Sequence, residues 1–273
     1  MSGSLGPEGG ERARPWREGP KGGVHELTGK VALVTGASKG IGAGIAAALG
    51  AIGVRVAVGY AQDRDGAESV VREINAMGGQ AIAVQGDLTK VTAIEDMVAT
   101  VVSAFGPLDI LVNNAGVYDF KALSEIDEAH FQRIFNANVL GLLMTTKVAV
   151  ASFNAAGGSV INISSLAALG NSPNSAVYSS SKAAVNALTK VLALELAERK
   201  IRVNVIMPGY FDTEGARAIG MKGSAQEAQL VAATPLEKRA GRPSDLAPVA
   251  VFLASGASAW MTGDVLTVSG GMR

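Results

Sequence analysis

Short runs rich in Val and Ile alternate with longer, Ala-rich segments of helical periodicity from Gly29 to the end of the chain. Residues 31–35, 54–58 and 81–84 read as strands, and a segment that reads as a helix follows each of them. Parallel strands need a crossover of about a dozen residues, so the alternation predicts right-handed βαβ units. We therefore expect an α/β fold, with a Rossmann-like, doubly wound parallel sheet of about seven strands and helices on both faces.

The rest of the chain continues this alternation. Further strands are expected at 109–112, 159–163, 202–206 and 264–268, and helices at 41–52, 65–77, 92–105, 125–135, 139–154, 177–199 and 244–254. The stretch from Tyr210 to Lys238 has the least pattern, and we expect it to form a mobile lid over the substrate. Residues 1–23 are rich in Gly, Pro, Arg and Glu, which predicts a disordered tail ahead of one catalytic domain at 24–273.

The composition of the chain excludes several classes of function. The formal net charge is zero, and apart from a short N-terminal cluster there is no basic block to bind nucleic acid. The chain has no cysteine, which excludes thiolate metal sites and cysteine nucleophiles. Neither His25 nor His130 has ligand-like partners, so we expect no metal site and place both residues at the surface. No signal sequence or unbroken apolar span is evident, which favours the cytoplasm and no membrane contact.

A glycine-rich turn, TGASKGIG at Thr35–Gly42, joins the first expected strand to the first expected helix. Glycines permit a tight turn and a close approach of the backbone to a pyrophosphate, and the helix N-terminus offers unpaired N–H groups. Glycine also serves ordinary turns, so the position at the first βα junction is what indicates a dinucleotide site. The expected cofactor contacts in this turn are Gly36, Ser38, Lys39, Gly40, Ile41 and Gly42.

The end of the second strand, Tyr60, is expected to lie near the adenine ribose of the cofactor. A carboxylate at this tip would accept from a free 2′-hydroxyl and repel a 2′-phosphate. No acid is present there, whereas Lys39 and Arg64 are available to a phosphate, so we expect NADP(H) rather than NAD(H). Two alternatives stay open: Asp63 or Asp65 could face the ribose, and Lys39 could be a solvated turn residue.

Polar and small residues follow the third and fourth strands, at the edge where such sheets bind ligands. Asp87, before Leu88, could accept from the adenine amino group or could cap the next helix. Asn114, Ala115 and Gly116 leave room for a ribose, and the preceding Asn113 could instead satisfy backbone groups between strands.

Tyr178 and Lys182 lie four residues apart in an expected helix, which puts both side chains on one face. A nearby ammonium stabilises phenolate, as does the positive nicotinamide ring of a bound oxidised cofactor. We therefore expect Lys182 and the cofactor together to lower the pKa of Tyr178 into the range of general acid–base catalysis. Ser165, after the fifth strand, could hydrogen-bond the substrate oxygen; Ser164 is the alternative, and an ordinary turn serine is a third reading.

Taken together, these motifs resemble the short-chain dehydrogenase/reductase family, in its compact single-domain branch. The resemblance runs from about Leu27 to Gly271. It rests on five motifs in order: TGASKGIG at 35–42, NNAG at 113–116, NVLG at 138–141, a serine thirteen residues before YSSSK at 178–182, and PG at 208–209. One departure is Ser269, where the family usually has an acid, and we expect this to affect subunit contacts more than catalysis.

The resemblance implies roles for residues at matching positions. Tyr178 would be the general acid in reduction and the base in oxidation, Lys182 would bind the nicotinamide ribose, and Ser165 would orient the substrate. Asn138, otherwise a kink or cap residue, would hold a water that links Lys182 to solvent. Pro208, Gly209 and Thr213 would contact the nicotinamide and its carboxamide.

The family also implies a homotetramer or dimer, formed by the helices around 138–154 and 178–199. Their apolar faces, which include Val148, Leu188, Val191 and Leu192, would fit either subunit contacts or an ordinary core.

The substrate is less constrained than the cofactor. The nearest resemblance is to 3-oxoacyl-carrier-protein reductases and to small-ketone or sugar dehydrogenases. An acidic carrier protein needs a basic docking surface. The stretches 154–158 and 192–194, where carrier-dependent reductases commonly have basic residues, contain none. We therefore expect a free small ketone, alcohol or sugar, with a carrier-bound acyl chain as the alternative and a non-catalytic NADP(H) sensor as a remote one.

Overall fold

A single parallel sheet organises the computed structural model, which describes residues 24–170 and 172–273. Its strand order is β3-β2-β1-β4-β5-β6-β7, and all neighbouring strands are parallel. The strands are β1 (Val31–Val34), β2 (Arg55–Tyr60), β3 (Gln80–Gln85), β4 (Ile110–Asn113), β5 (Gly158–Ile163), β6 (Ile201–Pro208) and β7 (Val265–Val268). The chain reverses its direction of winding between β1 and β4, so the carboxyl ends of these strands are where a ligand crevice is expected.

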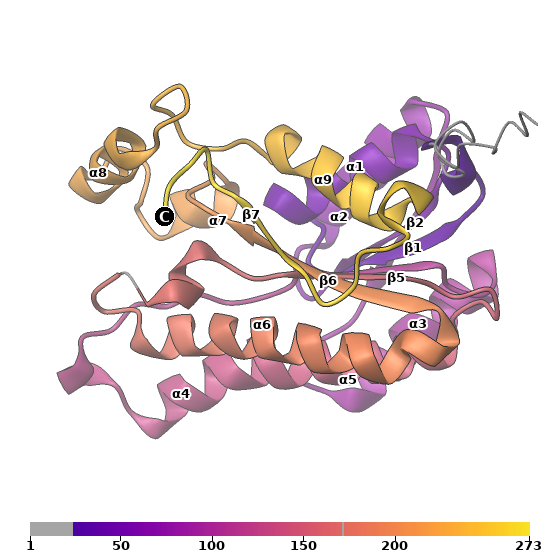
Figure 1. Ribbon diagram of the computed structural model, residues 1–273, viewed down its shortest axis with the longest axis horizontal. Helices are drawn as coiled ribbons and strands as arrows, with labels where there is room; N and C mark the ends of the chain where they lie inside the picture. The colour runs from indigo at the N-terminus through magenta and orange to yellow at the C-terminus, as the bar shows by residue number, and fades with distance from the viewer. Residues whose placement is uncertain (1–23, 171) are drawn as a thin grey trace, which may run out of the picture.

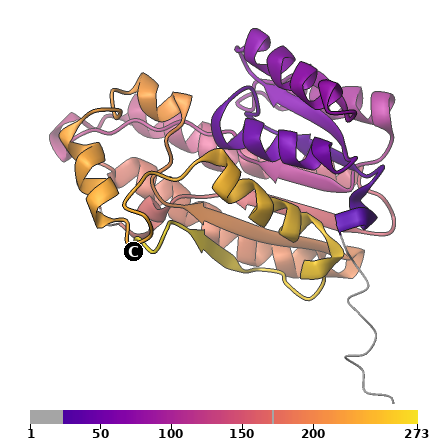
Figure 2. The same cartoon turned by 90° about the horizontal axis from the view of Figure 1, so that it is seen from above.

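Helices cover both faces of the sheet (Figure 1). One layer contains α1 (Gly40–Ala51), α2 (Arg64–Ala76) and α9 (Pro243–Ala254), and the other contains α3 (Val91–Phe105), α4 (Glu128–Phe135), α5 (Gly141–Ala151) and α6 (Ala176–Leu196). Two short helices, α7 (Glu214–Ala218) and α8 (Ala225–Ala233), lie together at one end, near the C-terminus (Figure 2).

The strands are apolar throughout because both faces of the sheet are covered. All four residues of β1 are buried. Successive side chains point to opposite faces, so Ala32 and Val34 pack in the layer of α1, whereas Val31 and Leu33 pack in the layer of α3. This double burial fixes the register of β1 between β2 and β4, and it places the glycine-rich turn at the carboxyl edge.

The predicted fold class is confirmed, with two local differences. The stretch 210–238 contains α7 and α8 rather than an unpatterned loop. The helices predicted on either side of residue 137 are joined by a π-helical turn at Asn136–Leu140, and a residue inserted into a helix in this way is often found at functional sites. The expected tail at 1–23 lies outside the described residues.

The helical run Glu128–Ala151 is, among the described residues, the one helix long and apolar enough to cross a membrane. It packs within the domain, and 44% of its most apolar window is buried there. A buried core helix meets the same criterion, so the finding is weak evidence for a membrane span.

Candidate active site

The glycine-rich turn is fastened to the loop after β4. Thr35 Oγ1 accepts hydrogen bonds from the amides of Asn114 and Ala115, each at 3.1 Å. Asn114 Nδ2 in turn donates to the carbonyls of Thr35 and Gly36. Gly36 has φ +60°, and a Cβ there would lie 2.8 Å from Cα of Ala115; a Cβ at Gly42 would lie 2.4 Å from Asn114 Nδ2. Both positions therefore require glycine, which keeps the backbone close to any ligand at this edge.

The start of α1 holds an anionic group. The N–H of Gly40, the first residue of α1, donates to Oε2 of Glu214 at 2.9 Å. The first amides of a helix lack intrahelical partners, and the helix dipole favours negative charge beside them. A carboxylate thus stands where this fold would place a cofactor phosphate, and the turn fits a dinucleotide.

The expected ribose corner brings Lys39 and Asp63 together. Lys39 Nζ lies 3.2 Å from Asp63 Oδ2, and Asp63 Oδ1 accepts from the amide of Gly66 at 3.1 Å as the N-cap of α2. The Ser38 hydroxyl also hydrogen-bonds this carboxylate. The side chain of Arg64 is 74% exposed, and its guanidinium lies 3.8 Å from the carboxylate of Glu68, one turn later in α2.

The ends of β2 and β3 are shaped by local contacts. Tyr60 is 9% exposed and packs in the core. Asp87 Oδ1 accepts from the hydroxyl of Thr89 at 2.7 Å and from its amide at 3.0 Å, and these hydrogen bonds lower the pKa of Asp87. The carbonyl of Leu88 faces Gly141, where a Cβ would lie 2.9 Å from that oxygen. Asp87 therefore orders the turn before α3, and its contact with adenine stays a prediction.

Asn113 is buried and bonds to side chains rather than to backbone groups. Its Nδ2 donates to Thr146 Oγ1 and to Asn162 Oδ1, each at 2.9 Å. Asn162 then donates to Thr189 Oγ1. This network joins β4 and β5 to α5 and α6 beneath the carboxyl edge.

The two candidate serines face in different directions. Ser164 is buried and donates to the carbonyl oxygen of Lys182 at 3.0 Å. Ser165 hydrogen-bonds the hydroxyl of Tyr178, and it also accepts from the amide of Ala167 at 3.2 Å. Ser165 is therefore the serine that shares a site with the phenol, and Ser164 anchors α6.

Tyr178 and Lys182 lie on one face of α6, as their spacing predicts. Lys182 is buried; its Nζ is 6.0 Å from the ring centroid of Tyr178 and donates to the carbonyl of Ile163 at 3.0 Å. Burial raises the pKa of Tyr178 to about 12, although the hydrogen bond with Ser165 opposes this, and burial lowers the pKa of Lys182 to about 8. Without a cofactor, burial disfavours the charged form of both groups, and the expected lowering of the Tyr178 pKa in the complex with the oxidised cofactor stays a prediction.

Asn138, in the π-helical turn, holds the loop after β4 against α6. Its Oδ1 accepts from the amide of Val117 at 2.8 Å, and its Nδ2 donates to the Val117 carbonyl and to Ser181 Oγ. A Cβ at Gly116 would lie 3.0 Å from Asn138 Oδ1 and 3.3 Å from Lys182 Nζ. Gly116 thus keeps space beside the ammonium, which suits a ribose, and the expected water at Asn138 stays a prediction.

Two aromatic residues that the sequence analysis missed cover the phenol. The ring centroids of Tyr118 and Phe120 lie 6.3 and 5.6 Å from that of Tyr178, both edge-on. Burial raises the pKa of Tyr118. Gly215 of α7 lies against the Tyr118 hydroxyl, so that a Cβ at this position would clash with it. The available signal was the pair of aromatics two and four residues after the NNAG motif, in a loop otherwise built from small and polar residues.

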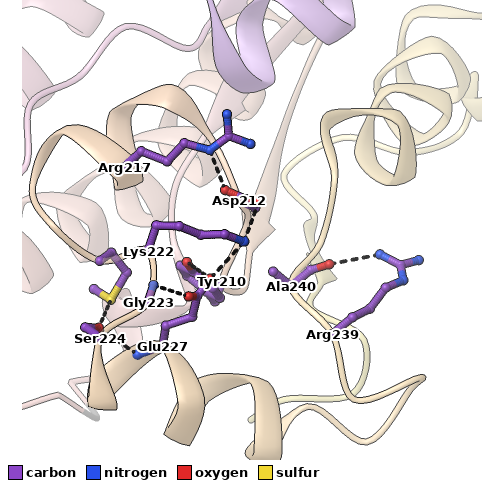
Figure 3. Close-up of polar contacts among 10 residues, drawn as sticks. Tyr210, Asp212, Arg217, Lys222, Gly223, Ser224, Glu227, Arg239 and Ala240 are labelled. Carbon is purple, nitrogen blue, oxygen red and sulfur yellow. Dashed lines mark hydrogen bonds and ion pairs between the residues drawn. The ribbon is translucent and has the colours of Figure 1, made fainter.

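The segment before and within α8 is held by charged contacts (Figure 3). Hydrogen bonds from Arg217 and Lys222 lower the pKa of Asp212 to about 2. Lys222 Nζ also lies 3.4 Å from Oε1 of Glu227, to which the hydroxyl of Tyr210 donates at 2.8 Å. The cations here are therefore matched by carboxylates from the same segment.

The remaining expected contacts lie at the ends of β6 and β7. Pro208 ends β6, and a Cβ at Gly209 would lie 2.8 Å from the Cβ of Ser269. Ser269 Oγ donates to the carbonyl of Met272 at 2.7 Å, so this serine closes a local turn. The hydroxyl of Thr213 caps α7.

The expected surface position of His130 is wrong. This residue is 3% exposed, and its Nε2 lies 3.3 Å from the carbonyl oxygen of Asp119, because the inner face of α4 is covered. The side chain of His25 lies outside the described part of the chain. Among the residues described, no group of three or more histidines and carboxylates could hold a metal ion.

Comparisons with known proteins agree with this geometry. A family model described as enoyl-(acyl carrier protein) reductase matches residues 36–273. An uncharacterized oxidoreductase of Methylorubrum extorquens is 53% identical over 250 residues, which span 92% of this chain and all of that protein. Versicolorin reductase 1 of Aspergillus parasiticus is 38% identical, with coverage of 90% and 97%. The crystal structure of a short-chain type dehydrogenase/reductase from Mycobacterium marinum has a TM-score of 0.86 at 35% identity, with coverage of 92% and 98%.

Proposed function

The chain belongs to the short-chain dehydrogenase/reductase family, and from this premise we propose that it interconverts a small ketone and its alcohol, or a sugar, with NADP(H). The observation that carries the proposal is the position of Lys182, which is buried one turn of α6 from Tyr178, with Ser165 beside the Tyr178 hydroxyl. A nicotinamide cofactor held at the glycine-rich turn would supply the hydride to the carbonyl carbon. Tyr178 donates its proton to the carbonyl oxygen, and Ser165 donates a hydrogen bond that stabilises charge on that oxygen.

The protonation state of Tyr178 suits the donation of a proton. With a pKa of about 12, the phenol keeps its proton at neutral pH. A general acid must carry its proton when the carbonyl oxygen gains charge. The chain itself therefore presents Tyr178 as a proton donor, and the preference for NADP(H) is what supports reduction as the physiological direction.

The preference for NADP(H) is supported by the ribose corner. Asp63 is already engaged by Lys39, Ser38 and the amide of Gly66, which makes it a cap of α2 rather than a free acceptor for a 2′-hydroxyl. A 2′-phosphate would add negative charge beside Lys39, whose side chain is 53% exposed. NADPH is thus the cofactor that these residues favour.

An apolar ketone suits the site better than a sugar or a carrier-bound chain. Tyr118 and Phe120 place ring edges next to Tyr178, and Phe120 is 40% exposed, so the substrate would meet aromatic rather than hydrogen-bonding surface. An acidic carrier protein would require unpaired cations near the entrance, whereas Lys222 is matched by Asp212 and Glu227.

We further propose a cytoplasmic homotetramer, with a dimer as the alternative. Of the four apolar residues expected at subunit contacts, Leu192 lies in the core and Val148 and Leu188 pack against it. Val191 is 51% exposed, and its neighbour Leu194 is 80% exposed, which supports α6 as a contact surface. Light scattering at several protein concentrations tests this assembly.

The test of the function is a panel of ketones and, in reverse, alcohols and sugars, monitored by the absorbance of the reduced nicotinamide with NADPH and with NADH. Tyr178→Phe should lower kcat by about a thousandfold or more while NADPH binding stays within about twofold, because only the transferable proton is removed. Equal or better activity with NADH would overturn the cofactor assignment. Full activity of Tyr178→Phe would overturn the mechanism, and a non-catalytic sensor would show no turnover with any substrate.

A further inference from the structure

Glu214 places a negative charge where the proposed cofactor needs a positive environment. Its carboxylate accepts from the first amide of α1 at 2.9 Å, although it belongs to α7, 174 residues later in the chain. Free amides at this position are the groups that bind a dinucleotide diphosphate in a doubly wound fold. A diphosphate and the Glu214 carboxylate therefore compete for the same donor and repel each other.

The position of Glu214 is fixed by its own segment. Thr213 caps α7 by accepting from the amide of Ala216 at 3.2 Å. Asp212 binds Arg217 at 2.8 Å and Lys222 at 2.9 Å, which ties both sides of α7 to one carboxylate (Figure 3). The contact with Gly40 thus comes from an ordered helix that several ion pairs hold in place.

The same helix contacts Tyr118, whose ring lies beside that of Tyr178. Gly215, next to Glu214, abuts the Tyr118 hydroxyl, where even a Cβ would be too close. A shift of α7 that moves Glu214 away from α1 also moves the surface against which Tyr118 packs. Helix α7 therefore contacts both the glycine-rich turn and the aromatic residue beside Tyr178.

We propose that Glu214 is a determinant of cofactor affinity, whose carboxylate must leave the α1 amide before the cofactor diphosphate can bind. The proposal rests on the proposed function, since it takes the ligand of this turn to be a nicotinamide dinucleotide. The cost of displacing the carboxylate from the α1 amide lowers the affinity for the cofactor.

The test is equilibrium binding to the full chain, without substrate. Glu214→Gln should tighten the Kd of NADPH and of ADP by about tenfold, because an amide oxygen competes more weakly for the N–H and does not repel phosphate. Adenosine, which has no phosphate, should bind both proteins equally. Glu128→Gln is the matched control, because Glu128 is also the first residue of its helix. The hydrogen bond described for its side chain is to Gln132 of the same helix, and not to α1.

A second variant keeps the proposal open to refutation if Glu214→Gln folds poorly. Asp212→Asn weakens both ion pairs that hold α7, and it should shift the ADP affinity in the same direction by a smaller factor. ADP affinities that differ by less than twofold among wild type and both variants would overturn the proposal. A wild-type chain that binds neither NADPH nor ADP would instead contradict the proposed function.

Discussion

At the amino edge of the sheet, Lys30 Nζ lies 2.9 Å from Asp109 Oδ1, and the second oxygen of Asp109 accepts from the amide of Val31. At the carboxyl edge, Lys182 is more deeply buried, and its described hydrogen bond is to the carbonyl of Ile163. The first lysine has its counter-charge within the fold, whereas burial lowers the pKa of the second to about 8. The Lys30–Asp109 pair at the amino edge thus stabilises the sheet, whereas the buried Lys182 ammonium at the carboxyl edge lowers stability, as is common for groups at functional sites.

Replacing each lysine by methionine should change the stability of the protein in opposite directions. Lys182→Met should lower kcat by about a thousandfold and raise the free energy of unfolding at pH 7 by roughly 3 kcal/mol, because a buried, poorly compensated ammonium is removed. Lys30→Met should keep the activity and lower stability by about 1 kcal/mol, because Asp109 loses its partner at a partly exposed site. Turnover and urea unfolding measure both effects; a less stable Lys182→Met protein would contradict the interpretation.

The pH dependence of stability should sharpen the contrast. Lys182 has a pKa of about 8 when folded and 10.5 when unfolded. Between these values the unfolded chain binds more protons, so wild-type stability should rise with pH relative to Lys182→Met, by about 1.4 kcal/mol per unit. The advantage of the variant should be full below pH 8 and vanish towards 10.5. If the difference in the free energy of unfolding between the two proteins stays constant from pH 8 to 10.5, the lowered pKa of Lys182 is refuted.

The adjacent serines offer a smaller test at the carboxyl edge. Ser165→Ala should lower kcat by about a hundredfold, because the substrate oxygen loses a hydrogen-bond donor in the transition state. Ser164→Ala should lower kcat by less than about tenfold and stability by about 1 kcal/mol, since it removes a buried hydrogen bond to α6. Steady-state kinetics and thermal unfolding separate the two, and a reversed order would assign the role to Ser164.

The smallest expected effect concerns cofactor choice. Lys39→Ala should weaken NADPH binding by about tenfold and leave NADH binding nearly unchanged, because only NADPH has a 2′-phosphate beside this ammonium. Arg64→Ala should change both by less than about threefold, since its guanidinium is exposed and paired with Glu68. Fluorescence titration with each cofactor measures these ratios, and equal losses for both cofactors would remove Lys39 from the phosphate site.

The sequence predicted the architecture because its information is local and periodic. Strand-like runs, helical spacing and the glycines of the first turn each constrain neighbouring residues, and the right-handed crossover leaves few topologies. Helical spacing alone also placed Tyr178 and Lys182 on one face of a helix. For the serine that faces Tyr178, the residues by themselves left both Ser164 and Ser165 as candidates.

Only the tertiary structure decided the chemistry of these groups. Burial, to which Tyr118 and Phe120 of a distant loop contribute, raises the pKa of Tyr178 in the chain without cofactor. Glu214 reaches α1 from 174 positions away. The protonation state of Tyr178 depends on which distant segments exclude water from it, and the contact of Glu214 with α1 depends on where α7 packs. The spacing of residues along the sequence does not encode such distances between remote segments.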